Sequence, residues 1–138
     1  MSFHPYLFFS DGRCKEAFTR YQEVFGGQLE MMTNADAPDG QGMTDASPDM
    51  VLHTALVVGD GAMLLGSDDP TGDGGPRSGS SVSYTAADQA DGKRIFDALA
   101  EGGEVTLPFG ETFWSPGFGM CTDRWGVPWM VGVNQEPR

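Results

Sequence analysis

The sequence predicts an α+β fold in which one chain carries two consecutive modules, each with the order strand, helix, strand, strand, strand. Three observations support this prediction. In each half of the chain, apolar residues at helical spacing follow a short strand. A glycine pair then ends each predicted helix, at Gly26-Gly27 and at Gly102-Gly103, and further short extended segments come after it. One such module has too few strands to cover both of its faces, so we expect two modules to bury a common core.

The first module is predicted to begin with a strand over residues 3–9. Ser10 and Asp11 follow and offer helix-capping and turn chemistry. The predicted helix 13–25 has one buried stripe, formed by Cys14, Ala17, Phe18, Tyr21, Val24 and Phe25. The later strands of this module are predicted at 28–33, 51–59 and 62–67.

The second module repeats this order. A strand is predicted over 80–86, and Asp88 can cap the helix that follows. The apolar positions of that helix are Ala90, Ile95, Phe96, Leu99 and Ala100. The extended segments after it are predicted at 104–114, 117–123 and 127–133. The chain is thus one domain, with module one at about 1–67, a linker at about 68–79 and module two at about 80–138.

Two segments interrupt the repeated pattern. Residues 34–49 make a long acidic loop, which could be a flap over a pocket, an arm at a dimer interface or plain disorder. Residues 66–80 are rich in glycine. They do not end in the GK[ST] sequence of a phosphate-binding loop, and a strand rather than a helix follows, so we interpret them as a linker.

The formal net charge is −12, from 20 acidic and 8 basic side chains. This charge repels nucleic acid phosphates and anionic membranes, so we expect neither as a partner. It either serves solubility alone or favours a small-molecule ligand that is neutral or cationic. The chain has no membrane-length apolar stretch, and its N-terminus does not read as a signal peptide. We therefore expect a cytoplasmic protein.

The two cysteines, Cys14 and Cys121, do not have metal-ligand spacing with each other or with the two histidines, His4 and His53. In a cytoplasmic protein they are expected to be reduced. One falls in a predicted helix and the other in a predicted strand, so we expect buried, inert thiols.

Three stretches of the chain resemble a known family: PYLFFSDGRCKEAFTRYQEVFGG at 5–27, HTALVVGD at 53–60 and LPFGETFWSPGFGMCTDRWGVPWMV at 107–131. Together with the tandem βαβββ order, they resemble the vicinal oxygen chelate superfamily of glyoxalases, bleomycin-resistance proteins and dioxygenases. The resemblance is strongest to its PhnB-like members, whose domain is often labelled 3-demethylubiquinone-9 3-methyltransferase. It implies a curved, mostly antiparallel sheet around a cavity with the helices outside, and a homodimer.

Metal-dependent members of this superfamily hold a divalent ion with His, Glu or Gln side chains from the first and last strands of the modules. By strand position, these places correspond here to Tyr6, a position near Leu64, Ser81 and Met130. None of these residues is an imidazole or a carboxylate, and His4, on the same strand face as Tyr6, would lack partners. We therefore expect no metal and no other cofactor. Methyltransferase activity is not expected either, because the chain has no glycine-rich turn leading from a parallel strand into a helix.

Strand alternation predicts which side chains face the cavity and which face the helices. Trp129 is predicted to face the helices and to belong to the core, whereas Trp125 lies at a turn. Of Phe113 and Trp114, we favour Trp114 as the one that points inward. The predicted ligand-binding residues are Tyr6, Phe8, His53, Ser81, Ser83, Trp114, Phe118, Met120 and Met130.

Three functions are compatible with these features. The first is a protein that binds a small molecule in an apolar, metal-free cavity. The alternative is a metal-dependent lyase, isomerase or dioxygenase, using a metal at a non-standard site, or an enzyme that uses His53 as a base. Glu111 would then be an acid or, more simply, a charge at the rim. The third is a dimeric protein whose cavity is filled by its own side chains.

Overall fold

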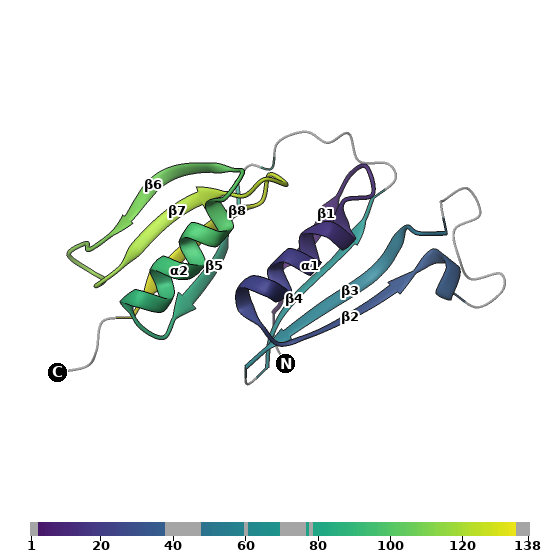
Figure 1. Cartoon of the computed structure of the whole chain (residues 1–138), viewed down its shortest axis with the longest axis horizontal. Coiled ribbons are helices and arrows are strands. Elements are labelled where there is room, and N and C mark those ends of the chain that lie inside the picture. The colour runs from purple at the N-terminus through teal and green to yellow at the C-terminus, as the bar shows by residue number, and fades with distance from the viewer. Residues whose placement is uncertain (1–2, 38–47, 60, 70–76, 78, 135–138) are drawn as a thin grey trace. The chain divides into compact units, whose positions relative to one another are not determined.

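The computed structural model describes residues 3–37, 48–59, 61–69, 77 and 79–134. The chain divides into two compact units, Met1–Gly75 and Pro76–Arg138, and each unit is described here by itself. In its described residues, each unit has one α-helix and four strands in the order that the sequence predicts (Figure 1). The division between the units falls inside the predicted linker.

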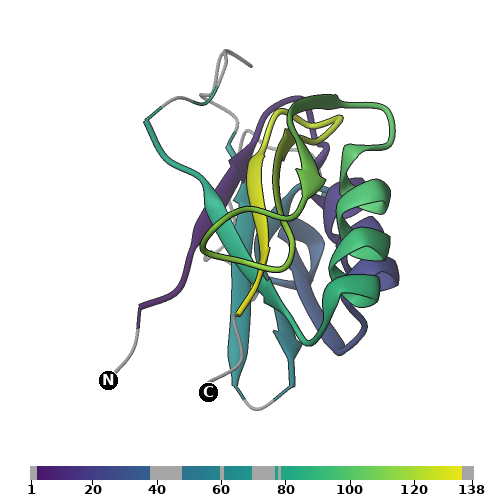
Figure 2. The same cartoon turned by 90° about the vertical axis from the view of Figure 1, so that its left-hand side faces the viewer.

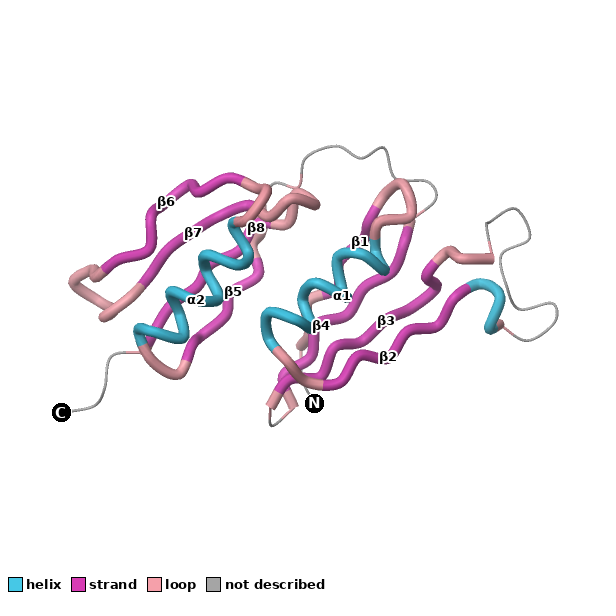
Figure 3. The backbone as a smooth tube through the Cα atoms, in the orientation of Figure 1, coloured by secondary structure: helices cyan, strands magenta, loops and turns pink. Residues whose placement is uncertain are grey.

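The first unit is a four-stranded sheet with the strand order β1-β4-β3-β2 (Figure 3). The β1–β4 pair is parallel and the other two pairs are antiparallel. Helix α1 covers one face of this sheet (Figures 1 and 2). We call the opposite face the helix-free face of the sheet. The bounds of the elements are β1 Tyr6–Phe9, α1 Cys14–Phe25, β2 Gln28–Thr33, β3 Val51–Val58 and β4 Ala62–Asp68, with a short 3-10 helix, η1, at Asn34–Asp36.

The second unit repeats this topology with the strand order β5-β8-β7-β6. Its parallel pair is β5–β8, and the other pairs are antiparallel, so both sheets are mostly antiparallel, as predicted. Helix α2 covers one face of the sheet, which defines a second helix-free face (Figure 2). The bounds of the elements are β5 Val82–Ala86, α2 Gln89–Ala100, β6 Glu104–Gly110, β7 Phe118–Thr122 and β8 Pro128–Val133.

A helix phenylalanine packs onto a strand glycine in each unit. A Cβ atom at Gly66 would lie 2.6 Å from the ring of Phe18, and one at Gly119 would lie 2.7 Å from the ring of Phe96. Both phenylalanines are buried. The absence of a side chain at these two strand positions therefore lets each helix approach its sheet closely.

The start of helix α1 differs from the prediction. Arg13 occupies the N-cap position and its side chain makes no capping hydrogen bond, so neither Ser10 nor Asp11 is the N-cap residue. The carboxylate of Asp68 lies there instead. Its Oδ1 accepts a hydrogen bond from the backbone N–H of Cys14 at 3.0 Å, and its Oδ2 accepts one from Val51 N–H at 2.9 Å. Asp68, assigned to the linker from the sequence, is thus the buried last residue of β4.

Helix α2 begins as predicted. Asp88 is its N-cap, and the Asp88 side chain accepts a hydrogen bond from the backbone N–H of Asp91 at 2.8 Å. This bond satisfies one of the N–H groups that the first turn of a helix leaves without a partner.

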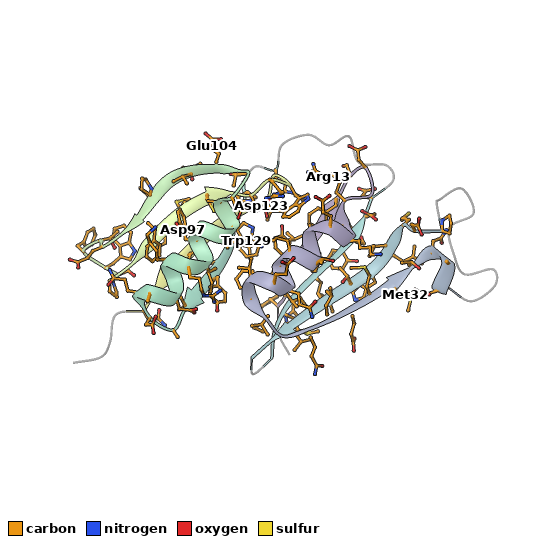
Figure 4. All side chains as sticks on the ribbon, in the orientation of Figure 1. Arg13, Met32, Asp97, Glu104, Asp123 and Trp129 are labelled. Atoms are coloured by element: carbon orange, nitrogen blue, oxygen red, sulfur yellow. The ribbon has the colours of Figure 1, made fainter. Side chains whose placement is uncertain are left out.

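The core of the second unit contains Trp129, which is 2 % exposed, as predicted for a helix-facing position. Its indole N–H donates a hydrogen bond to Oδ2 of Asp123 at 2.9 Å (Figure 4). Oδ1 of the same carboxylate accepts from the backbone N–H groups of Trp125 and Val127, both at 2.9 Å. One buried carboxylate therefore joins the β7–β8 turn to the core.

Two strand boundaries differ from the sequence-based expectation. The extended segment predicted over 104–114 ends at Gly110, and its register with β7 shifts twice, so Phe113 and Trp114 lie in the β6–β7 loop. Strand β5 begins at Val82, so Ser81 precedes it. The predicted acidic loop 34–49 and linker 68–79 lie largely outside the described residues. Neither helix in the described ranges is long and apolar enough to cross a membrane.

Candidate functional site

The helix-free face of the first sheet carries aromatic side chains on its edge strand β1. Tyr6 and Phe8 are 38 % and 54 % exposed, whereas Leu7 and Phe9, which alternate with them, are buried on the side of α1. The cross-strand register brings residues of this face together in three pairs: Tyr6 with Leu65, Phe8 with Ser67, and Met32 with His53. The face therefore combines aromatic and apolar side chains with a histidine, two hydroxyl groups and the exposed carboxylate of Glu30, which pairs with Ala55.

Tyr6 and His53 contact each other on this face. Tyr6 Oη lies 3.4 Å from His53 Nδ1, and the two ring centroids are 5.9 Å apart. The Tyr6 ring also lies against Phe8, with 5.0 Å between centroids. The three rings come from β1 and from β3, which β4 separates in the sheet. The fold thus places the Tyr6–His53 pair next to a third ring, that of Phe8.

The helix-free face of the second sheet is also apolar. Strand register places Met130 beside both Ser83 and Met120, and Phe118 beside Gly132. The alternating residues of β8, Trp129 and Val131, are buried on the other face. The β5–β8 and β6–β7 registers place three further side chains of the edge strands on this helix-free face: Thr85, Glu104 and Leu107.

Trp114 extends this face from the β6–β7 loop. Its ring centroid lies 5.6 Å from that of Phe118, in an edge-to-face arrangement, and the residue is 49 % exposed. Phe113 packs against Trp114 at 4.8 Å and is 93 % exposed. Trp114 is therefore the ring of this pair that contacts the sheet.

The loop that carries Trp114 is held by the buried Ser115. The Ser115 Oγ lies within hydrogen-bonding distance of the carbonyl oxygens of Gly117 and Val133, and accepts from their N–H groups at 3.2 and 3.3 Å. The backbone N–H of Thr112 donates to the carbonyl oxygen of Ser115 at 2.9 Å. These bonds fix the loop to the end of β8, and with it the position of the indole.

The residues at the superfamily's metal positions do not fit a divalent cation. Leu64 is buried on the helix side, and Leu65 is the residue beside Tyr6. Ser83, rather than Ser81, is beside Met130. A phenol, a hydroxyl and two apolar side chains are poor donors for such an ion. In the described ranges, no group of three or more His, Cys, Asp or Glu side chains could hold a metal.

Most predicted ligand-binding residues lie on the two helix-free faces. Tyr6, Phe8 and His53 lie on the first, and a larger set lies on or over the second, namely Ser83, Trp114, Phe118, Met120 and Met130. Ser81 is exposed before β5, and Glu111 is exposed in the loop. Ser67, Leu65 and Met32 were not among the predicted residues. Alternation along β2 and β4 is the signal that could have indicated them.

The two thiols are poor nucleophiles. Burial, followed by the charge of Asp68, raises the pKa of Cys14 to about 12. Burial, followed by the charge of Asp123, raises the pKa of Cys121 to about 11. Because the thiolate is the reactive form, both cysteines are inert near neutral pH. Their burial confirms the prediction made from the sequence.

Two βαβββ units, each with one helix on one sheet face and an apolar opposite face, define the glyoxalase type of α+β protein. Residues 5–131 match the model of the Glyoxalase/Bleomycin resistance protein/Dioxygenase superfamily, and the chain belongs to this superfamily. The chain is 32 % identical to Protein YjdN of Escherichia coli (strain K12), over 99 % of each chain. The superfamily predicted from the sequence is thereby confirmed.

Solved structures agree with this assignment. Protein PA1353 from Pseudomonas aeruginosa is 42 % identical, with a TM-score of 0.86 over 99 % of each chain. A PhnB protein from Bacillus cereus, described as a putative 3-demethylubiquinone-9 3-methyltransferase, is 21 % identical, with a TM-score of 0.76 over 96 % of this chain and 99 % of that one. The second likeness concerns the fold alone.

Proposed function

We propose that this protein binds a small, flat, largely apolar molecule on a helix-free sheet face, without a metal. The observation that carries the proposal is the contact between Trp114 and Phe118, whose ring centroids are 5.6 Å apart. Trp114 remains 49 % exposed although Ser115 anchors its loop. A half-exposed indole held against a second ring offers a flat ligand a fixed surface to stack on.

The composition of both faces supports binding rather than catalysis. Exposed aromatic side chains lie beside hydrogen-bonding groups on both faces, such as His53 on the first and Ser83 on the second, and this combination is typical of small-molecule sites. Covering apolar area stabilises a complex by roughly 25 cal/mol per Å². The net charge of −12 repels anions, so the ligand class is neutral or cationic.

Two finer properties come with this proposal. We expect a homodimer in the cytoplasm, as the resemblance to PhnB-like proteins implies, and light scattering should give about twice the mass of one chain. We do not extend the methyltransferase description of the Bacillus cereus protein to this chain. The connections from β1 to α1 and from β5 to α2 are not glycine-rich turns of the cofactor-binding type.

Tryptophan fluorescence tests the proposal directly. Titration with proflavine, a flat cationic dye, should quench the wild-type protein and a Trp125→Phe control. Trp114→Phe should remove most of the quenching, and Trp114→Ala should weaken binding by about fivefold, since one stacked ring contributes around 1 kcal/mol. Equal quenching in Trp114→Phe and wild type would contradict a site at this indole.

The same titration separates the proposal from the metal-dependent alternative. Dye binding should be unchanged after treatment with a chelator. The protein should also take up none of zinc, nickel, manganese or iron at stoichiometric amounts. Tight uptake of one of these ions would favour a lyase, isomerase or dioxygenase that uses a non-standard metal site.

A further inference from the structure

A polar cluster lies within the aromatic helix-free face of the first sheet. Ser67 pairs with Phe8 across β1 and β4, so its side chain points to this face. The β3–β4 register pairs Thr54 with Gly66, which brings His53 and Ser67 to adjacent positions on the two strands. Tyr6 completes the cluster, because its hydroxyl oxygen lies 3.4 Å from His53 Nδ1.

Ser67 is the buried member of this cluster. The residue is 6 % exposed, but its Oγ is not among the buried side-chain atoms that lack a hydrogen-bond partner in the described ranges. Another buried serine, Ser115, differs from it, since its Oγ accepts hydrogen bonds from the backbone N–H groups of Gly117 and Val133. The position of Ser67 is the relevant feature, because the register places its hydroxyl on the helix-free face beside Phe8 and opposite His53, where a bound molecule could reach it.

The cluster offers hydrogen-bond donors to such a partner. When Tyr6 donates its phenol proton to His53 Nδ1, the neutral imidazole carries its own proton on Nε2. His53 Nε2–H and the Ser67 O–H then lie at adjacent positions on this face, and each can donate to a bound molecule. Phe8 and Met32 flank them and supply apolar contact.

We propose that His53 and Ser67 bind the carbonyl oxygen of a flat, uncharged aromatic ligand, with Tyr6 acting as a positioning residue that holds the His53 tautomer. The proposal rests on the proposed function and names its ligand class more closely. Two hydrogen-bond donors favour a ligand that carries an acceptor group, and they offer no stabilising contact to a cation. The net charge of −12, with Glu30 on the same sheet face, disfavours an anionic acceptor such as a carboxylate.

Three ligands of similar size test this selection: acetophenone, ethylbenzene and benzoate. Binding to the full-length ¹⁵N-labelled protein is followed by NMR, including the imidazole nitrogens of His53. Acetophenone should bind about tenfold tighter than ethylbenzene, since two hydrogen bonds each contribute modestly to affinity. Benzoate should bind most weakly. Only acetophenone should shift the Nε2 resonance.

Ser67→Ala and His53→Leu should each remove most of the preference for acetophenone and leave ethylbenzene binding unchanged. Tyr6→Phe should reduce the preference less and change the tautomer signature of His53. Ser80→Ala, an exposed serine outside the cluster, is the matched control and should behave as wild type. The ¹H–¹⁵N spectrum of each variant checks that it is folded.

The outcomes separate this inference from the function on which it rests. Equal binding of acetophenone and ethylbenzene, or tighter binding of benzoate, would overturn the carbonyl subsite. Quenching of Trp114 by proflavine would still support the proposed function, because it does not depend on the carbonyl subsite. An unchanged preference for acetophenone in both Ser67→Ala and His53→Leu would overturn it as well.

Discussion

The indole N–H of Trp129 donates a hydrogen bond of 2.9 Å to the carboxylate of Asp123, and both residues are buried. The other oxygen of this carboxylate accepts from two backbone N–H groups in the β7–β8 turn. One side chain thus connects a turn, two strands and the largest aromatic residue of the core (Figure 4).

Asp123→Ala should lower the free energy of unfolding by about 2–4 kcal/mol. The change leaves three N–H donors without their acceptor in a buried region, and each such loss is costly. Urea denaturation followed by tryptophan fluorescence measures the effect. Asp97→Ala is the control, because Asp97 forms an exposed ion pair with Lys93, and it should change stability much less. A similar small change in both variants would contradict the role of Asp123.

Asp68→Ala should destabilise the protein by about 1–3 kcal/mol, because Asp68 accepts from the first N–H of helix α1 and from Val51 N–H. Asp11→Ala should have a smaller effect, since Asp11 is exposed and is not the N-cap residue. Hydrogen exchange of the Cys14 and Val51 amides should accelerate in Asp68→Ala. A larger loss of stability in Asp11→Ala than in Asp68→Ala would contradict the role of Asp68 and would favour the capping residues predicted from the sequence.

Gly66→Ala and Gly119→Ala should each cost about 1–3 kcal/mol in thermal or urea unfolding. An added methyl group would collide with the ring of Phe18 or Phe96, and overpacking of a core forces its neighbours to shift. The combination of Gly66→Ala with Phe18→Leu should recover part of the loss. Gly110→Ala is the control, because a Cβ atom there meets nothing within 4 Å.

Stability should fall as the pH rises above about 9. The pKa of Cys14 is raised from 9.0 to about 12 and that of Cys121 to about 11, so the folded state holds thiol protons that the unfolded chain releases. This contribution is complete below the unfolded value near 9 and is lost as the pH rises through the folded values. Cys14→Ala should flatten the decline of unfolding free energy between pH 9 and pH 11. Iodoacetamide should label neither thiol at pH 7.5 until urea unfolds the protein.

Much of the fold follows from local patterns. The apolar spacing of 13–25 and of the helix after Asp88 predicts both helices, because burial of one stripe requires a period near 3.6 residues. The alternation within β1, β7 and β8 predicts which side chains face the helix, and the burial of Trp129 and Val131 agrees with it. These features depend only on neighbours along the chain.

Other features required the tertiary structure. The cap of α1 comes from Asp68, which is 54 positions away from Cys14 in the sequence, so no local motif could indicate it. Register shifts in β6 end the strand before Phe113 and Trp114, and bulges of this kind depend on the partner strand. The meeting of Tyr6, His53 and Ser67 depends on strand order, since β4 lies between β1 and β3.

The sequence by itself therefore determined the number, type and order of the elements, the superfamily, and the aromatic character of the predicted ligand-binding residues. Periodicity and turn chemistry act over a few residues and can be read without a partner segment. Only the tertiary structure decided which carboxylates are buried, which loop carries Trp114, and which hydroxyl lies beside His53. Those outcomes depend on long-range strand pairing, whose register is set by the packing of the whole sheet.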